Sequence, residues 1–465
     1  MRRHATVLVA FALLAASCGQ YPGVHEAALE AGEIPAGGSG LAPATGIEAS
    51  GSAAGASEGT TTAGASTGTV PPTSADPTGA SGAGQAAAGT ASGAAALPAG
   101  GGTTTGVTPT TIKLGLHAPL TGAAPLKAES FNRGKDAYWL RGADGKPVEI
   151  FGRQVEVVFQ DDQYNPSHAR VVCSQMAEQQ EVFMLVGGGG TDQIQTCANY
   201  AASKGIPYVS VGTTEIGLTR LPNYYGVSMS YADQVPLLAQ YVNANRGTLG
   251  WGGDGSKIAA VITNTPNFDD AAAAFEQSFP GARMLRPEKN ERGGTMAGQL
   301  CTGTLKNFEV VFPLTAPTYF LEMAGSAKCN PQYVGVGISM GLNQVVGVGC
   351  TSGGIANARF FSPAPAFADS DKYDPEFRKA GGADDIEWLL WGLWKSIHQL
   401  LLKAGKNLTR EGFIQSSATA SYETGVFPQV GMSASNHFGA KQVNVLRADC
   451  NRREYVTEQA FKSSF

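Results

Sequence analysis

The sequence lacks the short motifs that mark the common classes of enzyme. It contains no Walker A loop, no H-E-x-x-H pair and no G-x-S-x-G elbow. Residues 335–341 and 347–353 have the spacing G-x-G-x-x-x-G, which is not the dinucleotide-binding spacing. Asp161 and Asp162 are adjacent at a strand end, where neighbours point to opposite faces and make a poor acid–base pair. We therefore expect no enzymatic activity and no cofactor.

The sequence also lacks the patterns of metal clusters and nucleic-acid surfaces. It has no C-x-x-C pair, no two of its six histidines lie within ligand spacing, and a net charge of −5 with no Lys/Arg block argues against a nucleic-acid partner. Besides Cys18, the chain has six cysteines, an even number that suits an exported protein. Fifteen pairings are possible. Proximity in sequence favours Cys173 with Cys197 and Cys301 with Cys329, which leaves Cys350 with Cys450.

No apolar run is long enough to span a membrane. Residues 1–17 carry two arginines and then a ten-residue apolar stretch, 7–16, which is typical of a secretory signal and falls short of the ~20 residues that a span needs. Residues 14–18 resemble a bacterial lipobox, although alanine stands at position 15 where that motif prefers leucine. The resemblance implies export and lipidation of Cys18, which would anchor the chain to the outer face of the bacterial membrane. The alternative is an ordinary cleavage site with a chance cysteine.

Charged and aromatic side chains are nearly absent from residues 35–110, where only Glu48, Glu58 and Asp76 are charged. Such a Gly/Ala/Ser/Thr/Pro-rich segment buries too little apolar surface to offset the entropy of ordering. We expect residues 18–110 to form a disordered tether, in which residues 35–110 have a root-mean-square reach of about 45–50 Å. A glycosylated segment is the alternative.

The remaining 355 residues exceed what one hydrophobic core usually serves, and in them strands alternate with helices. This alternation predicts an α/β protein with two lobes, each a mostly parallel sheet flanked by helices, joined by a hinge of several strands. We assign the first lobe to 111–230 and 355–425, the second to 231–354, and a last hinge crossing with a second-lobe segment to 426–465. The predicted elements are strands at 112–117, 154–160, 182–186, 207–211, 257–263, 309–314, 332–336, 359–361 and 442–446, and helices at 129–140, 167–180, 192–204, 231–245, 269–279, 295–306, 318–327 and 384–404.

Four segments, 111–122, 157–166, 186–190 and 205–207, resemble the branched-chain amino acid (leucine/isoleucine/valine)-binding family of type I periplasmic binding proteins, and the likeness extends over nearly all of 111–448. The resemblance implies a monomeric clamp that closes on a small-molecule solute and delivers it to the permease of an ABC importer. It also implies a disulfide near the second and third helices. The alternatives are a ligand sensor of the same fold that signals to a membrane partner, and a secreted hydrolase.

The candidate ligand-binding residues of the first lobe follow its strands. At a predicted helix start, a carboxylate or carbonyl oxygen of a ligand could accept hydrogen bonds from the backbone amides of Gly189 and Gly190 and from the Thr191 hydroxyl. The purely structural alternative is a tight turn with Asp192 as the helix N-cap. A fixed carboxylate at Asp192 would favour an amine or a hydroxyl. Further candidates, each equally explained by turn chemistry, are Leu120, Thr121, Thr213 and Thr214.

The second lobe contributes Phe268, Thr315 and Ser339, each shortly after a predicted strand. Phe268 is also compatible with a core position. The family's amino acid binders carry an acidic residue after the last of these strands, whereas this chain has none near Ser339. An amino acid or related polar compound is then a doubtful solute unless Asp192 or Asp269 pairs with its ammonium group. An amide, an aromatic acid or a polyol fits the sequence equally well. A stripe of three tryptophans, 388, 391 and 394, predicts core packing of the long helix.

Overall fold

The computed structural model describes residues 102–211, 216–301 and 308–465, which belong to one compact unit. The predicted signal peptide (1–17), the lipidation site Cys18 and nearly all of the predicted tether lie outside the described residues. The same holds for Thr213 and Thr214, and for the end of the helix predicted at 295–306.

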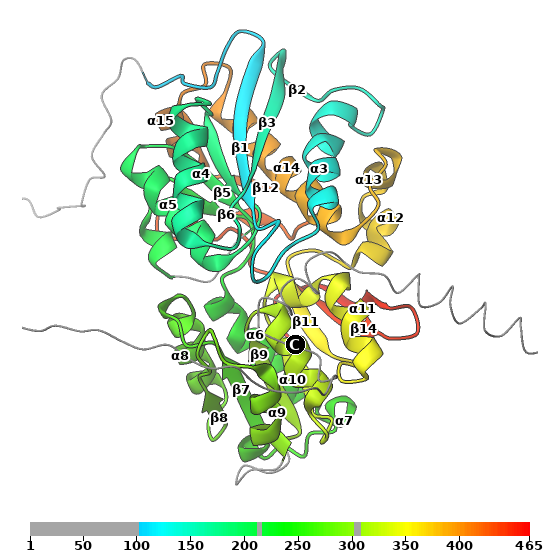
Figure 1. The fold of residues 1–465 in the computed structure, drawn as a ribbon. Helices are drawn as coiled ribbons and strands as arrows, with labels where there is room; N and C mark the ends of the chain where they lie inside the picture. The colour runs from blue at the N-terminus through cyan, green and yellow to red at the C-terminus, as the bar shows by residue number, and fades with distance from the viewer. Residues whose placement is uncertain (1–101, 212–215, 302–307) are drawn as a thin grey trace, which may run out of the picture. The chain divides into compact units, whose positions relative to one another are not determined.

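The first lobe is built on a six-stranded sheet with the order β2-β3-β1-β4-β5-β6 (Figure 1). All neighbouring strands are parallel except β2, which pairs antiparallel with β3. The elements are β1 (Thr111–Ala118), α3 (Ala128–Asp136), the π-helical turn η1 (Ala137–Arg141), β2 (Glu149–Ile150), β3 (Arg153–Asp161), α4 (Pro166–Glu178), β4 (Met184–Gly187), α5 (Thr191–Ser203), β5 (Tyr208–Ser210), η2 (Ile216–Arg220) and β6 (Tyr224–Gly226).

The central strands of this sheet are apolar on both faces because helices cover both. α4 and α5 pack on one face around Cys173 and Cys197, and α3 and α14 (Asp385–Ala404) pack on the other (Figure 1). A parallel sheet covered in this way needs strands without polar alternation. Trp388, Trp391 and Trp394 of α14 are buried in the second of these cores, which confirms the predicted packing role of the tryptophan stripe.

The second lobe has a seven-stranded sheet with the order β15-β14-β11-β10-β9-β7-β8. β14 pairs antiparallel with both of its neighbours, β11 and β15, and all other neighbouring strands pair parallel. One core lies under α6 and α8, and another under α9, α10 and α11. The elements are α6 (Tyr231–Ala244), α7 (Arg246–Leu249), η3 (Gly255–Lys257), β7 (Ile258–Ile262), η4 (Pro266–Phe268), α8 (Asp269–Ser278), β8 (Arg283–Leu285), α9 (Gly293–Cys301), β9 (Val310–Leu314), α10 (Pro317–Ser326), β10 (Gln332–Gly335), η5 (Ile338–Gly341), α11 (Asn343–Ser352), β11 (Arg359–Ser362), β14 (Val443–Asp449) and β15 (Glu454–Lys462).

The position of β11 differs from the prediction. We assigned residues from 355 onward to the first lobe, but β11 pairs with β10 and β14 in the second sheet. All four of its residues are buried, so the second core holds this strand. The chain enters the first-lobe core at Ala364 and leaves that lobe at Phe438. Near its start it still contacts the second lobe, because Ala366 is buried in a second-lobe core and the Asp369 carboxylate accepts the Thr457 N–H at 3.0 Å. The returning elements are η6 (Phe367–Asp369), α12 (Ser370–Tyr373), α13 (Pro375–Lys379), α14, α15 (Arg410–Ser417), β12 (Ser421–Tyr422) and β13 (Val430–Gly431).

The segment that precedes β1 is fixed to the first lobe by α15. The carboxylate of Glu411 accepts hydrogen bonds from the backbone N–H of Thr103 at 2.7 Å and from its hydroxyl at 3.0 Å. The backbone N–H of Arg410 donates to the Thr103 carbonyl at 2.9 Å. The described chain therefore begins in contact with the first lobe.

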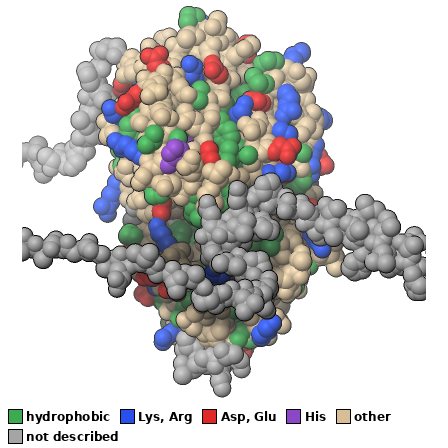
Figure 2. Space-filling model, in the orientation of Figure 1, with side chains coloured by type: hydrophobic (Ala, Val, Ile, Leu, Met, Phe, Trp, Pro, Cys, Tyr) green, Lys and Arg blue, Asp and Glu red, His purple; other side chains and the backbone are tan. Residues whose placement is uncertain are grey.

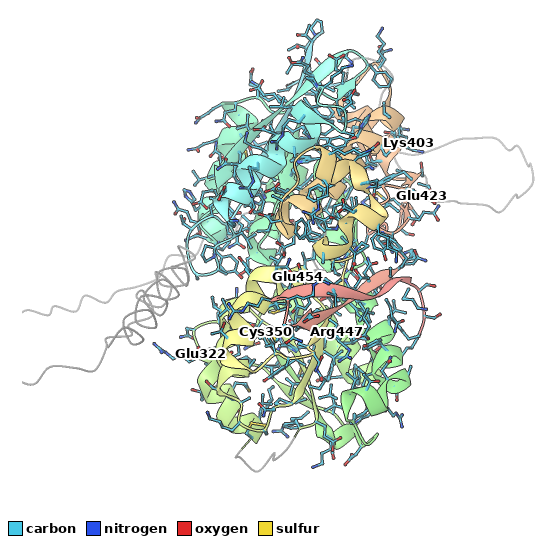
Figure 3. All side chains as sticks on the ribbon, turned by 90° about the vertical axis from the view of Figure 1, so that its right-hand side faces the viewer. Glu322, Cys350, Lys403, Glu423, Arg447 and Glu454 are labelled. Atoms are coloured by element: carbon cyan, nitrogen blue, oxygen red, sulfur yellow. A yellow bond between two sulfur atoms is a disulfide. The ribbon has the colours of Figure 1, made fainter. Side chains whose placement is uncertain are left out.

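All three predicted disulfides are confirmed. Cys173–Cys197 joins α4 to α5, Cys301–Cys329 joins the end of α9 to the loop after α10, and Cys350–Cys450 joins α11 to the turn between β14 and β15. Figure 3 labels Cys350, which lies in α11, and Arg447, which lies in the neighbouring strand β14. The third bond thus ties the last strands of the chain to the second lobe.

Two further predictions concern surfaces. In the described part of the chain, no helix combines the length and the apolar character that a bilayer span requires. On the face shown in Figure 2, Lys and Arg side chains are interspersed with Asp and Glu rather than gathered into one basic patch. This mixed surface gives no support for a nucleic-acid partner.

Candidate functional site

The loops after β1 and β3 are held together by Asp161. Its carboxylate accepts hydrogen bonds from the Leu120 N–H at 2.8 Å, the Thr121 hydroxyl at 2.6 Å and the Gln163 N–H at 2.8 Å. Burial raises the pKa of Asp161, but these hydrogen bonds outweigh it and leave that pKa below the ordinary value. Leu120 and Thr121, which the sequence suggested as ligand-binding residues, therefore lie beside the β3 loop. The Thr121 hydroxyl donates its hydrogen bond to Asp161.

The glycine-rich loop leads from β4 into α5, as predicted. The helix N-cap is Gly190, at φ +78°, and no side chain caps the helix. Asp192 lies in the first turn, so its interpretation as N-cap is wrong. A Cβ on Gly188 would lie 2.9 Å from the His117 carbonyl oxygen, so the loop requires glycine at this close approach of two backbones. The loop thus presents backbone N–H groups at the positive end of a helix dipole.

Asp192 connects the two lobes. Its carboxylate accepts a hydrogen bond from the Asn267 side-chain amide and pairs with the Lys289 ammonium group. Asn267 lies in η4, after β7, and Lys289 lies in the loop after β8. The ion pair is partly exposed, with 27% of the Asp192 side chain and 57% of the Lys289 side chain accessible. The carboxyl ends of strands from both sheets therefore meet at Asp192.

The sequence did not predict two tyrosines of this region: Tyr164, which lies near Asp192, and Tyr231, which lies near Tyr164. Burial is the main cause that raises the pKa of Tyr164 to about 12, with smaller contributions from the nearby charge of Asp192 and from Tyr231. Burial likewise raises the pKa of Tyr231 to about 12, and the Ile338 N–H opposes this by bonding to the Tyr231 side chain. Tyr231 is only 7% exposed. We call Tyr164, Gly189–Asp192, Tyr231, Asn267, Lys289 and Ile338 the interlobe site.

Tyr164 is presented by an unusual backbone. Gln163 and Tyr164 have φ values of +57° and +50°, a left-handed conformation that is uncommon for residues other than glycine. The Asp162 carboxylate accepts the Tyr164 N–H at 3.0 Å and so supports this turn. Strained backbone of this kind persists where surrounding contacts fix it and is concentrated at functional sites.

The three second-lobe candidates lie after β7, β9 and β10, as predicted. Phe268 is half-buried and packs against the second-lobe core. Thr315 is nearly buried, and its hydroxyl donates to the Ala316 carbonyl at 3.1 Å. Ser339 is partly exposed in η5, one residue after Ile338. Of these candidates, Ser339 is next in sequence to a residue of the interlobe site, and Phe268 is next to Asn267.

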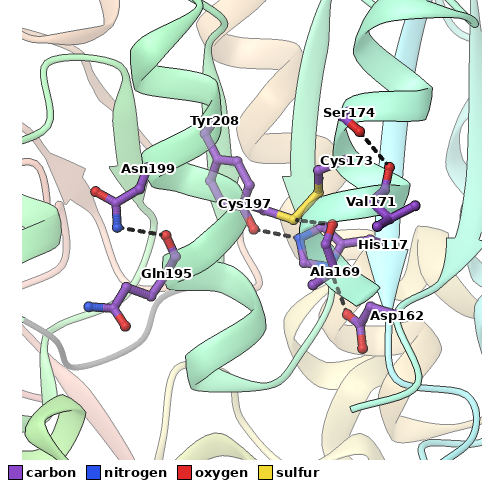
Figure 4. The surroundings of a disulfide bond; sticks show 10 residues. All are labelled: His117, Asp162, Ala169, Val171, Cys173, Ser174, Gln195, Cys197, Asn199 and Tyr208. Carbon is purple, nitrogen blue, oxygen red and sulfur yellow. Dashed lines mark hydrogen bonds and ion pairs between the residues drawn. A yellow bond between two sulfur atoms is a disulfide. The ribbon is translucent and has the colours of Figure 1, made fainter. Parts of the chain in front are cut away.

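A buried polar network lies behind the β3 loop (Figure 4). His117 bonds through Nδ1 to Asp162 at 2.8 Å and through Nε2 to the Tyr208 hydroxyl at 2.7 Å. All three side chains are fully buried. Burial raises the pKa of Tyr208 well above its ordinary value. The Cys173 and Cys197 sulfurs lie beside His117 but are bonded to each other. With Asp161 and Asp162 both holding turns, the adjacent carboxylates form a structural pair.

Comparison with known structures shows the fold. A fatty acid ABC transporter substrate-binding protein from Thermomonospora curvata has a TM-score of 0.63 at 16% identity, over 78% of this chain and 95% of its own. A solute-binding protein of an R. palustris ABC transporter, in complex with 4-hydroxybenzoate, has a TM-score of 0.62 at 15% identity, over 76% and 96%. The branched-chain amino acid transporter substrate-binding protein LivJ from Streptococcus pneumoniae, in complex with isoleucine, has a TM-score of 0.60 at 16% identity, over 76% and 100%.

The family is shown by sequence. Among curated proteins none matches this chain. The model of the periplasmic binding protein family matches residues 111–453, which span both lobes and the hinge. The family consists of binding proteins, in line with the expectation that the chain is not an enzyme. With its two-lobed type I fold and this match over most of its length, the chain belongs to the periplasmic binding protein family.

Proposed function

We propose that the chain is an extracytoplasmic receptor that binds a small solute between its lobes and delivers it to the permease of an ABC importer. The observation that carries this proposal is the meeting of strand ends from both sheets at Asp192, Asn267 and Lys289. In open α/β sheets, ligands bind outside the carboxyl ends of the strands. Closure of two such edges on a solute buries it and shifts an open–closed equilibrium without covalent chemistry.

The relatives support a small solute but leave its class open. The structures similar to this chain include one described for fatty acids, one that holds 4-hydroxybenzoate and one that holds isoleucine. The same fold therefore accepts solutes with and without an ammonium group. We place the ligand of this chain at the interlobe site, with Leu120, Thr121, Thr315, Ser339 and Phe268 at its edge.

A thermal-shift screen of the mature chain tests the proposal. A solute at 100 times its Kd should add about 2.7 kcal/mol to the free energy of unfolding. The panel contains carboxylic acids, amino acids, amides and sugars. If no member raises the melting temperature, the receptor proposal fails.

The variant Tyr164→Ala locates the ligand. Loss of the ring should raise the Kd of the identified solute about tenfold, because an aromatic side chain contributes roughly 1–3 kcal/mol of contact. Phe151→Ala is the matched control, since Phe151 is also a first-lobe aromatic with positive φ, +52°, but is 40% exposed in the turn between β2 and β3. Equal affinities of the two variants would contradict the placement of the ligand.

We further propose that Cys18 carries the lipid anchor. The intact chain should then fractionate with membranes and require detergent for release. The variant Cys18→Ser should be recovered without detergent. Release of both forms without detergent would contradict the anchor and leave the binding proposal intact.

A further inference from the structure

Exposed apolar side chains gather at one end of the first lobe. The described residues contain four exposed large hydrophobic side chains, and three of them, Leu140, Phe151 and Leu402, lie in η1, in the β2–β3 turn and near the end of α14. The fourth, Val171, lies in α4. Single exposed apolar residues are common on protein surfaces, whereas a group of them marks an interaction surface.

The three elements that carry these side chains are in contact. α14 packs against both η1 and β2. The His398 ring of α14 lies 6.0 Å from the Trp139 ring of η1, measured between centroids, and Leu402 follows His398 by one turn on the same helix face. Arg153, directly after the β2–β3 turn, donates through Nη1 to the Lys406 carbonyl at 3.2 Å. We call the following residues the basic apolar tip: Leu140, Phe151, Leu402, Lys403 and Lys406.

Phe151 occupies a turn position that favours other residues. Phe151 and Gly152 connect β2 to β3 with φ values of +52° and +78°, and the flanking residues Ile150 and Arg153 pair across the hairpin. A two-residue hairpin turn with two positive φ values favours Asn, Asp or Gly and disfavours a bulky side chain. The ring is 40% exposed, so burial does not offset this cost in full. The fold alone therefore gives little reason for a phenylalanine here.

Positive charge predominates around the exposed ring. Lys403 and Lys406 are exposed at the end of α14, where Figure 3 labels Lys403. Residues 137–153 and 402–407 together contain five cations and two carboxylates: Arg141, Lys146, Arg153, Lys403, Lys406, Asp144 and Glu149. Apolar side chains among lysines and arginines are complementary to the surface of an anionic membrane, which takes the apolar groups between its headgroups and attracts the cations.

The tip lies at the end of the first lobe where the described chain begins. Arg153 donates through Nε to the Thr108 carbonyl at 2.8 Å, and Figure 1 shows β2 at the end of this lobe that is far from the second lobe. We propose that the basic apolar tip docks on an anionic lipid bilayer, with the Phe151 ring among the headgroups and the lysines at the membrane surface. This contact goes beyond the proposed receptor function and does not depend on an anchor at Cys18. It leaves the interlobe site, at the opposite ends of the strands, away from the bilayer.

Vesicle sedimentation of the Cys18→Ser chain tests the proposal without any lipid anchor. This chain should bind vesicles of phosphatidylcholine mixed with phosphatidylglycerol, and high salt should release it without detergent. Binding to phosphatidylcholine alone should be at least about tenfold weaker. The double variant Lys403→Gln/Lys406→Gln should weaken binding to the anionic vesicles about 30-fold, the scale expected for two cations near such a surface. No binding to the anionic vesicles, or equal binding to both kinds, would overturn the proposal.

The variant Phe151→Asn separates docking from folding. Vesicle binding should weaken about tenfold, because no aromatic ring then leaves water, while the melting temperature should stay the same or rise, because asparagine suits the turn. Val171→Ala is the matched control and should leave vesicle binding unchanged. A lower melting temperature of Phe151→Asn would show that the ring supports the fold, and undiminished vesicle binding would exclude it from the contact. Self-association that Phe151→Asn abolishes in sedimentation velocity, without vesicle binding, would assign the tip to a second copy of the chain and overturn the membrane contact.

Discussion

Replacement of His117 by leucine should destabilise the first lobe severely. His117 is fully buried and bonds to Asp162 at 2.8 Å and to the Tyr208 hydroxyl at 2.7 Å. Its removal leaves a buried carboxylate without its main partner, which costs about 3–5 kcal/mol. It also strands the Tyr208 hydroxyl, which adds roughly 1–3 kcal/mol. We therefore expect a loss of at least about 3 kcal/mol.

Two companion variants separate the charge from the packing. Tyr208→Phe removes only the hydroxyl and should cost about 1 kcal/mol. The double variant His117→Leu/Asp162→Asn also removes the buried carboxylate of Asp162. The side-chain amide oxygen of the new asparagine can still accept the hydrogen bond from the Tyr164 N–H. This double variant should recover about 2 kcal/mol relative to His117→Leu, because the uncompensated charge is the main cost.

Urea unfolding followed by tryptophan fluorescence measures these losses. Four of the five tryptophans, at 139, 388, 391 and 394, lie in the first-lobe core, so the signal reports that lobe. The reasoning would be refuted if His117→Leu cost less than about 1 kcal/mol, or if the double variant were as unstable as the sum of its parts.

Three further predictions concern other parts of the chain. Replacing Cys350 and Cys450 by alanine should lower the free energy of unfolding by about 4.7 kcal/mol, because this disulfide joins residues 100 apart in sequence. Replacing Cys173 and Cys197, which are 24 residues apart, should lower it by about 3.5 kcal/mol. Urea unfolding of the two variants compares these losses, and a larger loss for Cys173–Cys197 would contradict the entropic explanation. Burial raises the pKa of Asp385 from 3.8 to about 6, so the folded state binds more protons between these values and the free energy of unfolding should fall, by at most about 3 kcal/mol, as the pH rises from about 4 to 6. Asp385→Asn should flatten this slope, and an unchanged slope would exclude Asp385 as its source. Glu411→Ala should speed amide exchange at Thr103 while the melting temperature stays nearly constant, because the two lost hydrogen bonds are exposed; unaltered exchange would show that Glu411 does not hold this segment.

Much of the fold could be predicted because most strands are short apolar runs between turns. The strand predicted at 112–117 is β1 (Thr111–Ala118), and that predicted at 309–314 is β9 (Val310–Leu314). β15 was missed because it is mostly half-buried at a sheet edge and shows no apolar run. The glycine-rich stretch 347–353 lies mostly inside α11, where a Cβ on Gly349 would lie 2.3 Å from Ile355 Cδ1. Close packing explains that glycine.

The site was predictable only at the level of loops. Parallel strands place their carboxyl ends at one edge, so Thr121, Asp192 and Thr315 could be assigned from strand order alone. The pairing of Asp192 with Lys289 joins residues 97 apart and depends on how the lobes meet. The position of Tyr164 depends on a left-handed backbone turn at residues 163–164, which no local sequence pattern predicts. The conformation of this turn depends on Asp162 and on the buried network that holds Asp162.

The attachment of Thr103 to α15 has a mechanical consequence. Thr103 precedes β1, so it lies toward the amino end of the first sheet, whereas the interlobe site lies at the carboxyl ends of the strands. A load applied at the start of the described chain therefore enters the first lobe alone, through Glu411 and the Arg410 backbone. The strands that connect the lobes carry none of this load directly. In the proposed receptor, the first lobe would bear this load, and opening and closing of the second lobe would not work against it.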